Sequence, residues 1–274
     1  MWNVLKNELK RSLFNKWILI AMLVTSIFCL LQFKEMYEGR MGYFEAIKEL
    51  GFEKSEYICT GSAYENWIMF ENYSMYRYIF LFIFPILAVM PYGMSYYMDV
   101  RSGYIKQMVS RMSMKTYARA KYIATFVSGG VAITVPMIMN FLFTATIFPM
   151  HKPYRFLGNM FGEQLLSGLF YNNPLIYTLF KLLLIFVVSG LMATISLLVS
   201  KYIFNYFSVF ITPFVLTFLL EFSVYITEYS YASFSMNLRA EIANSENLVV
   251  LLSEILIMFV ITYVGFVRSK TEVY

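Results

Sequence analysis

Charged side chains are scarce in this sequence. They make up 14% of the 274 residues, whereas soluble domains carry about a quarter. A soluble protein of this length needs far more charge to cover its surface, so the scarcity excludes a soluble enzyme, a disordered chain and a coiled coil. Hydrophobic residues make up 59% of the chain, and the mean hydropathy is +0.60. These values are typical of a protein that crosses a membrane several times.

Residues that bind metals or form disulfides are also few. The chain has two cysteines and one histidine. Cys29 lies in an apolar run and Cys59 in a polar loop, so we expect no disulfide between them. No CxxC or HExxH spacing occurs, and an isolated His151 is more typical of a solvated or interfacial side chain than of a ligand. We therefore predict no metal site and no catalytic residues on this chain.

A phosphate-binding loop is missing as well. Such a loop needs a glycine-rich turn followed by Lys and then Ser or Thr, because its backbone amides surround the phosphates. No GxxxxGK[ST] pattern occurs among the 13 glycines. Gly129 and Gly130 instead lie inside an apolar run, where small residues ease helix packing. The chain is therefore predicted not to be an enzyme, to hold no cofactor and not to hydrolyse ATP by this mechanism.

Six apolar runs are long enough to span a bilayer, whose core of about 30 Å needs roughly 20 residues per helix. Prolines inside such helices are tolerated when neighbouring groups bond to the freed carbonyls, so each run is predicted as one span, kinked where it holds proline. The predicted fold is all-α, with a single transmembrane domain over 1–274. The six predicted spans cover residues 17–33, 78–97, 123–148, 175–199, 207–226 and 248–266.

Basic residues are distributed unevenly between these runs. With the amino terminus inside, the four inner segments carry 13 Lys and Arg against 3 Asp and Glu, and the three outer segments carry 8 against 12. The positive-inside rule then places both termini in the cytoplasm. The inner segments are 1–16, 98–122, 200–206 and 267–274; the outer ones are 34–77, 149–174 and 227–247. The outer loop 34–77 is the largest of them, and helical spacing at 43–50 is compatible with a small cap.

The first 16 residues are predicted to form an amphipathic helix on the inner membrane surface. An apolar stripe recurs at helical spacing and lysines lie elsewhere on the helical wheel. The alternative is a simple flank that only sets the topology. No small-residue cleavage site follows the first span, which is therefore predicted to be an uncleaved anchor. The stripe consists of Trp2, Leu5, Leu9 and Leu13.

The inner loop 98–122 has an apolar side and a basic side. A short amphipathic helix in a cytoplasmic loop can lie flat and dock into a groove on a soluble partner. The alternative is a basic loop that only sets the topology, and composition does not separate the two. The apolar residues Val100, Tyr104, Met108 and Met112 recur every four positions, and Arg101, Lys106 and Arg111 supply the charge.

The same loop resembles that of ABC type-2 exporter permeases. In that family an acidic residue, a small residue with glycine, a basic residue, an arginine and a later Tyr-x-x-x-Lys follow the second span. The six spans, the amphipathic amino-terminal helix and the large first outer loop resemble it too. This chain has Asp99 where the family often has Glu, and Met112 near a frequent Pro. The matching residues are Asp99, Ser102, Gly103, Lys106, Arg111, Tyr117 and Lys121.

The resemblance implies how such a protein works. The first inner loop would carry a coupling helix that inserts into a cleft of an ABC ATPase subunit, and segment 200–206 would make a second contact. ATP and magnesium would be bound by that partner. The permease would pair with a second copy or a homologous permease in the cell membrane of a bacterium, without nucleic acid, and would export a hydrophobic or amphipathic peptide, drug or lipid. The expected contact residues are Asp99, Arg101, Gly103, Tyr104, Lys106 and Arg111.

Three ionisable residues lie at membrane depth: Lys181, Glu221 and Glu254. A charge near the centre of a spanning helix costs about 2.5–3.5 kcal/mol, so such residues usually face the protein interior or water. They are candidates for a polar element of a substrate path, and Lys181 with Glu221 or Glu254 could form an ion pair. The alternative, which we favour for Lys181, is that its long side chain reaches the membrane surface.

Three other functional classes remain open as alternatives. An ion-driven secondary transporter would need more intramembrane carboxylates and usually more than six spans. A non-transporting sensor or immunity subunit would lack an ATPase partner. An intramembrane enzyme would need a nucleophile with a base, or paired carboxylates on facing helices, and the runs contain no aspartate.

Overall fold

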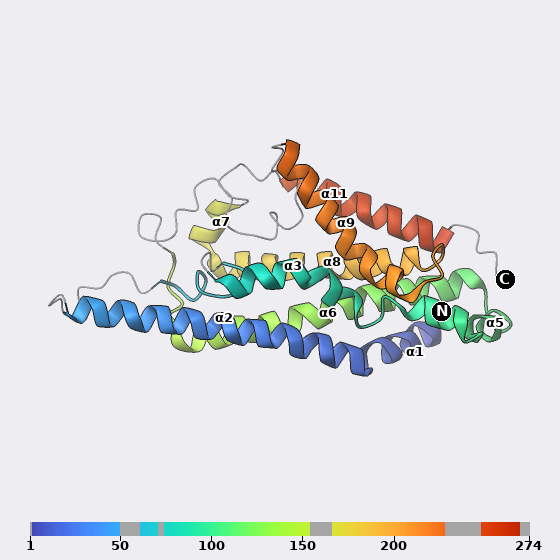
Figure 1. Ribbon diagram of the computed structural model, residues 1–274, viewed down its shortest axis with the longest axis horizontal. Coiled ribbons are helices and arrows are strands. Elements are labelled where there is room, and N and C mark those ends of the chain that lie inside the picture. The colour runs from blue at the N-terminus through green and yellow to red at the C-terminus, as the bar shows by residue number, and fades with distance from the viewer. Residues whose placement is uncertain (1, 50–60, 71–73, 154–165, 228–247, 269–274) are drawn as a thin grey trace.

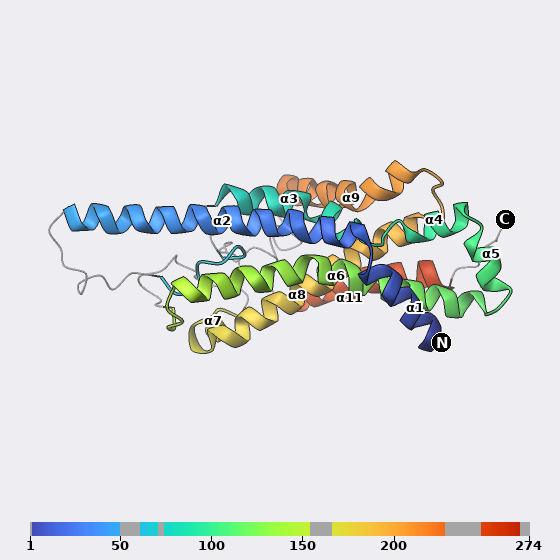
Figure 2. The same cartoon turned by 90° about the horizontal axis from the view of Figure 1, so that it is seen from below.

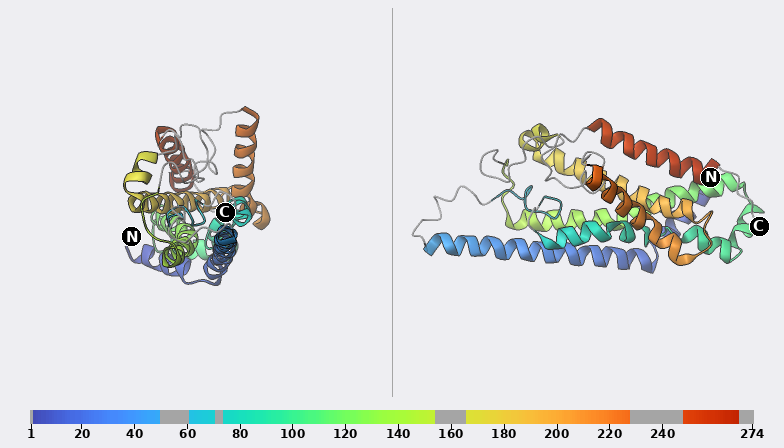
Figure 3. Two further views of the ribbon diagram at one scale, coloured as in Figure 1. Left: turned by 90° about the vertical axis from the view of Figure 1, so that its left-hand side faces the viewer. Right: turned by 45° about the horizontal axis from the view of Figure 1, so that its top comes forward.

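The computed structural model describes residues 2–49, 61–70, 74–153, 166–227 and 248–268. These residues form helices and no strands. The long helices run along the long axis of an elongated bundle (Figure 1). Figure 3 shows α2 and α11 on opposite sides of it, with α6 and α8 between them. The all-α prediction is confirmed.

Two helices, separated by a bend, form the amino-terminal part. The first is α1 (Trp2–Leu13) and the second is α2 (Lys16–Glu49). Asn15 lies between them and caps α2, because its Oδ1 accepts hydrogen bonds from the backbone N–H groups of Trp17 and Ile18, both at 2.9 Å. Its Nδ2 donates to the carbonyl of Pro91 at 3.2 Å. One side chain therefore starts α2 and ties the bend to a distant turn.

The second apolar run is not one kinked span, as predicted for 78–97. Helix α3 (Met75–Val89) ends before Pro91, residues 90–94 form turns, and α4 (Ser95–Arg101) follows. Pro85, in contrast, is accommodated inside α3. Met90, which precedes Pro91, still has helical backbone angles, but Pro91 has no N–H to continue the helical hydrogen bonds, and Asn15 binds its carbonyl.

The two central helices are α6 (Met114–Ile147) and α8 (Pro174–Val199). A Cβ added at Gly129 of α6 would lie 2.7 Å from the Cβ of Ala193 in α8. Glycine is therefore what allows the two backbones to approach this closely, as predicted for an apolar run that contains adjacent glycines.

Four helical segments in the described part of the chain are long and apolar enough to cross a membrane. They are Lys16–Gly42 in α2, α6, α8 and Leu251–Arg268, which joins α11 (Leu248–Tyr263) to a π-helical turn η3 (Val264–Arg268). The other two predicted spans correspond to shorter apolar helices, α3 and α9 (Tyr206–Thr227). The chain is therefore an all-α membrane protein. A short helix, α7 (Ser167–Asn172), precedes α8.

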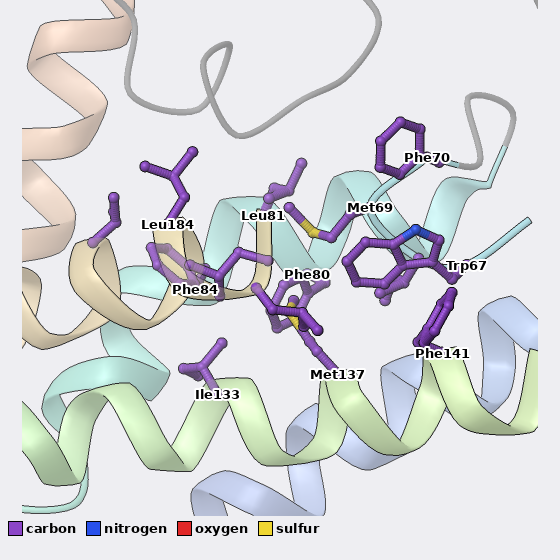
Figure 4. Close-up of a cluster of buried hydrophobic side chains, with 14 of the residues drawn as sticks. Trp67, Met69, Phe70, Phe80, Leu81, Phe84, Ile133, Met137, Phe141 and Leu184 are labelled. Carbon is purple, nitrogen blue, oxygen red and sulfur yellow. The ribbon is translucent and has the colours of Figure 1, made fainter. Parts of the chain in front are cut away.

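Part of the predicted outer loop 34–77 lies inside the bundle. Helix α2 continues to Glu49, and residues 61–70 pack against α6 and α3, with Trp67 fully buried (Figure 4). The side chain of Asn140 in α6 accepts from the N–H of Ile68 at 3.0 Å and donates to the carbonyl of Cys29 at 3.0 Å. A buried amide that bonds to both backbones fixes this segment beside α2, so residues 61–70 are a part of the core. The helix predicted as a small cap at 43–50 is instead the continuation of α2 as far as Glu49.

The predicted inner segments gather at one end of the bundle. Asp99 of α4 bonds to Arg11 of α1, Tyr96 of α4 packs edge-on against Phe266 of η3, and Lys201 after α8 donates to the carbonyl of Phe266 at 2.8 Å. At the other end, the N–H of Ala63 donates to the carbonyl of Pro149 at 3.1 Å, which joins two predicted outer segments. For the described parts of these segments, the grouping made from charge alone therefore matches their grouping in space; the predicted outer segment 227–247 and most of the inner segment 267–274 lie outside the described residues.

Candidate functional site

The loop 98–122 contains a short helix at the end of the bundle, α5 (Tyr104–Val109) (Figure 2). The apolar period predicts one continuous helix, but Gly103 interrupts it. This residue has φ 72° and ψ 3°, the left-handed conformation that glycine adopts without a steric penalty. Its N–H donates to the carbonyl of Val100 at 3.1 Å. After α5 the chain turns into α6, where Ser113 caps the helix by accepting from Thr116 N–H at 3.3 Å.

The basic side of this loop faces outward. Arg101, Lys106 and Arg111 are exposed, whereas Ile105 is buried. Ile105 belongs to an apolar cluster with Tyr96, Tyr117 and Phe266, among others. The apolar side therefore anchors α5 on the bundle and leaves the basic side chains of the loop exposed.

Beneath α5 lies a fully buried lysine. Lys121 of α6 has no exposed side-chain surface. Its ammonium lies 2.5 Å from Oδ2 of Asp99 and 3.2 Å from Oε2 of Glu8. It also donates to the hydroxyl of Tyr92 at 3.1 Å, and that hydroxyl donates to Oε2 of Glu8 at 2.6 Å. One buried cation thus holds α1, α4 and α6 together.

A second cation completes this group. Arg11 of α1 donates to Asp99 Oδ1 at 2.9 Å and to Glu8 Oε1 at 3.0 Å, and its guanidinium lies 4.6 Å from the centre of the Tyr104 ring in α5. Tyr117 donates to Asp99 Oδ2 at 2.6 Å. We call this group, Glu8, Arg11, Tyr92, Asp99, Tyr117 and Lys121, the charge cluster. It contains two cations and two anions and connects α5 to α1, α4 and α6.

Electrostatics within the charge cluster favour the ionised form of Asp99. Burial by itself raises the pKa of this carboxyl, but the charge of Lys121 and hydrogen bonds from Arg11, Lys121 and Tyr117 outweigh it, so the pKa lies below its ordinary value. The same carboxylate raises the pKa of the Arg11 guanidinium against the effect of burial. Both groups are therefore charged throughout the physiological range.

Asp99 differs from the other predicted contact residues because its side chain is buried. This side chain is bound entirely within the chain. It can position α4 and α5, whereas Arg101, Lys106 and Arg111 are exposed; contact of these residues with a partner stays a prediction. Gly103 shapes the turn, and Tyr104 is partly buried beneath Arg11.

Sequence reasoning missed Glu8, Arg11 and Tyr92. In α1 the side that faces the bundle carries Glu8 and Ser12, which are both buried. The apolar stripe is left partly or largely exposed, with Trp2 at 73%. A usable signal existed, because Glu8 is the only acidic residue among the first 16 and lies one turn before Arg11.

An open groove adjoins the charge cluster. It has a volume of about 630 Å³ and lies between the α1–α2 bend, the turn at 90–94, α4 and the start of α9. We call it the junction groove. The charged residues of its lining are Arg11 and Asp99, and its apolar lining residues include Phe14, Trp17, Met90, Met94, Met98 and Phe210.

The three intramembrane residues lie apart from the charge cluster. Lys181 in α8 is 1% exposed, so it does not reach the membrane surface as we favoured; its ammonium lies 5.7 Å from the Tyr177 ring centre. Glu221 lines a smaller cavity of about 260 Å³ between α3 and α9. Glu254 is half-buried in α11. A role for them in a substrate path stays a prediction.

Within the described ranges, no group of three or more His, Cys, Asp or Glu side chains is arranged to hold a metal ion. Comparison of the chain with protein-family models, with curated proteins and with solved structures finds no match. Its function is therefore inferred from the residues of the site.

Proposed function

We propose that this chain is the membrane-spanning permease subunit of an ABC exporter. It would have six spans, with α3 and α9 completing the set, and both termini in the cytoplasm. ATP would be hydrolysed by a separate ATPase subunit, and two permeases would form the transport path for a hydrophobic or amphipathic substrate. The proposal extends the resemblance of the loop 98–122.

One observation carries it. The loop that contains α5 presents three exposed basic side chains at the end of the bundle: Arg101 at the end of α4, Lys106 in α5 and Arg111 in the turn after it. The charge cluster ties α4 to α6, which runs through the bundle. A force applied to α5 by a partner would therefore be transmitted to a long central helix rather than absorbed by a flexible loop. A loop that only sets the topology needs positive charge but not this buried connection.

The orientation is supported by charge. The segments at the α5 end carry the excess of Lys and Arg, and the structure brings these segments together. The positive-inside rule then places α5 in the cytoplasm, where an ATPase subunit would be found.

The test is purification of the tagged full chain from its native membranes in mild detergent. We expect a co-purifying protein that carries a P-loop, identified by peptide mass spectrometry, and ATPase activity in the same fraction. The variant Lys106→Glu/Arg111→Glu reverses exposed charge on the docking side and should abolish both. The matched control Lys34→Glu/Lys48→Glu makes the same change of charge in α2, away from α5, and should retain both.

Two results would contradict the proposal. If the wild-type chain purifies without any P-loop protein in several detergents, the result would favour an ion-driven transporter or a sensor subunit instead. A partner that is lost equally from both charge-reversal variants would show that it binds through net charge and not through α5.

A further inference from the structure

The junction groove is a concave, largely apolar site that the proposed transport mechanism does not use. Its volume of about 630 Å³ falls within the range of small-molecule sites. Three of its lining residues, Met90, Met94 and Met98, follow one another at intervals of four. Methionine side chains are flexible and polarisable and adapt to irregular apolar ligands. Such a wall suits a chain-like hydrocarbon better than a rigid ring.

The groove adjoins the start of a helical segment that is long and apolar enough to cross a membrane. The membrane-crossing part of α2 begins at Lys16, and Trp17, in its first turn, lines the groove. Phe14, at the bend, is 82% exposed. Aromatic side chains at the end of a span are typical of the headgroup region. A lipid whose hydrocarbon chain enters the groove would therefore keep its polar headgroup at the depth of the phosphates of the membrane lipids.

Two cationic side chains are close to the groove: Arg11, which lines it, and Lys16, which precedes the lining residue Trp17. Glu8 and Asp99 use two of the five N–H donors of Arg11, and the side chain remains 41% exposed. Lys16 lies over the Trp17 ring, with its ammonium 5.6 Å from the ring centre. No carboxylate of the described residues lies within ion-pair distance of Lys16. Since the four charges of the charge cluster cancel, Lys16 is an excess positive charge beside the groove.

We propose that the junction groove binds one anionic phospholipid of the membrane. An acyl chain lies along the methionine wall, and the phosphate is held by the free donors of Arg11 and by Lys16. A zwitterionic lipid offers the same hydrocarbon but no net negative charge, so the site selects for the anionic headgroup. This site depends on the position of the chain in a membrane and not on an ATPase partner. The lipid site and the proposed function can therefore be refuted independently of each other.

The test is native mass spectrometry of the purified full chain with added phosphatidylglycerol or phosphatidylcholine of identical acyl chains. We expect one phosphatidylglycerol to stay bound at collision energies that remove phosphatidylcholine. Lys16→Gln should weaken the affinity for phosphatidylglycerol about fivefold, the usual effect of one basic residue near an anionic surface. The control Lys115→Gln removes an exposed charge on the first turn of α6, outside the groove lining, and should leave binding unchanged.

A second pair of variants tests the apolar wall. Met98→Trp places a larger side chain in the groove and should remove the bound lipid. Met139→Trp makes the same change in α6 at nearly equal exposure, 50% against 51%, and should not. Equal retention of the two lipids, equal loss in the two lysine variants, or retention by Met98→Trp would each overturn the proposal. A shift in the monomer-to-dimer ratio of Met98→Trp without loss of lipid would assign the groove to a second copy instead.

An independent measurement covers the case in which Met98→Trp does not fold. In Trp2→Phe protein, the buried Trp67 is shielded and Trp17 is the tryptophan that quenchers reach. Dibrominated phosphatidylglycerol in phosphatidylcholine vesicles should quench Trp17 more strongly than the same amount of dibrominated phosphatidylcholine. Equal quenching by the two lipids would refute the selectivity.

Discussion

Removal of the Lys121 charge is the most direct test of the charge cluster. Lys121→Met keeps the length and apolar stem of the side chain and deletes the ammonium that contacts Glu8 and Asp99. Two carboxylates then share Arg11 alone, which leaves one uncompensated negative charge in the interior. Breaking a buried ion pair by removing one partner costs about 3–5 kcal/mol. We therefore expect Lys121→Met to lower the free energy of unfolding by about 3–5 kcal/mol.

The assay is reversible unfolding by titration with sodium dodecyl sulfate in mixed micelles, reported by thiol labelling of Cys29. This thiol is buried in the fold, and Cys59→Ser in all samples makes it the single reporter. Lys115→Met, an exposed position in the same helix, should change the free energy by less than about 0.5 kcal/mol.

A double variant separates charge balance from lost packing. Lys121→Met/Asp99→Asn leaves one cation and one anion, Arg11 and Glu8, so it should cost less than the two single variants together, by about 1–3 kcal/mol. The deficit of Lys121→Met should also shrink as the pH falls, because one carboxylate takes up a proton and neutrality returns. A loss below about 1 kcal/mol, or strict additivity of the two changes, would refute the view that the cluster works as a neutral unit.

Three further outcomes are expected in the same titration. Gly103→Ala forces a residue with a Cβ into the left-handed conformation and should cost about 1–2 kcal/mol, whereas a value near zero would mean that the turn relaxes. The pKa of Asp99 is lowered in the fold, so the stabilisation by its carboxylate is complete above its ordinary pKa of about 4 and is lost as the pH falls through the folded pKa. Asp99→Asn should therefore reduce the fall in the free energy of unfolding at acid pH. An unchanged dependence on pH would contradict the view that Asp99 causes it. Gly129→Val should cost about 1–3 kcal/mol by pushing α6 away from Ala193, and Gly168→Ala, where a Cβ meets nothing within 4 Å, should cost much less; similar losses would argue against close packing as the cause.

Local sequence patterns identified the helices but not all of their interruptions. Apolar runs predict spans because backbone groups in a membrane must bond within their own helix, and all six runs contain helix. The break after α3 depends on more than Pro91, since Pro85 is tolerated in the same helix. The turn at Pro91 is also held by the distant amide of Asn15, which donates to the carbonyl of Pro91. No local pattern contains that partner.

The loop 34–77 shows the same limit at a larger scale. Its polar composition predicts a segment outside the membrane, yet Trp67 is fully buried and Asn140 bonds to the backbone beside it. Burial of this segment requires a polar partner in α6, 72 residues away. Polarity in the sequence therefore did not mean exposure to water, because a buried hydrogen bond can replace water.

The sequence by itself determined the class of the protein, the helices of its apolar runs and the grouping of the described segments at two ends, because hydropathy and charge act on each segment independently of the others. Only the tertiary structure decided which side of α1 faces inward. The apolar stripe predicts lipid contact, but nothing in the first 16 residues reveals that Glu8 meets Lys121 at 3.2 Å. A buried charge is stable only with a precisely placed partner, and for Glu8 that partner is supplied by a helix more than a hundred residues later in the chain.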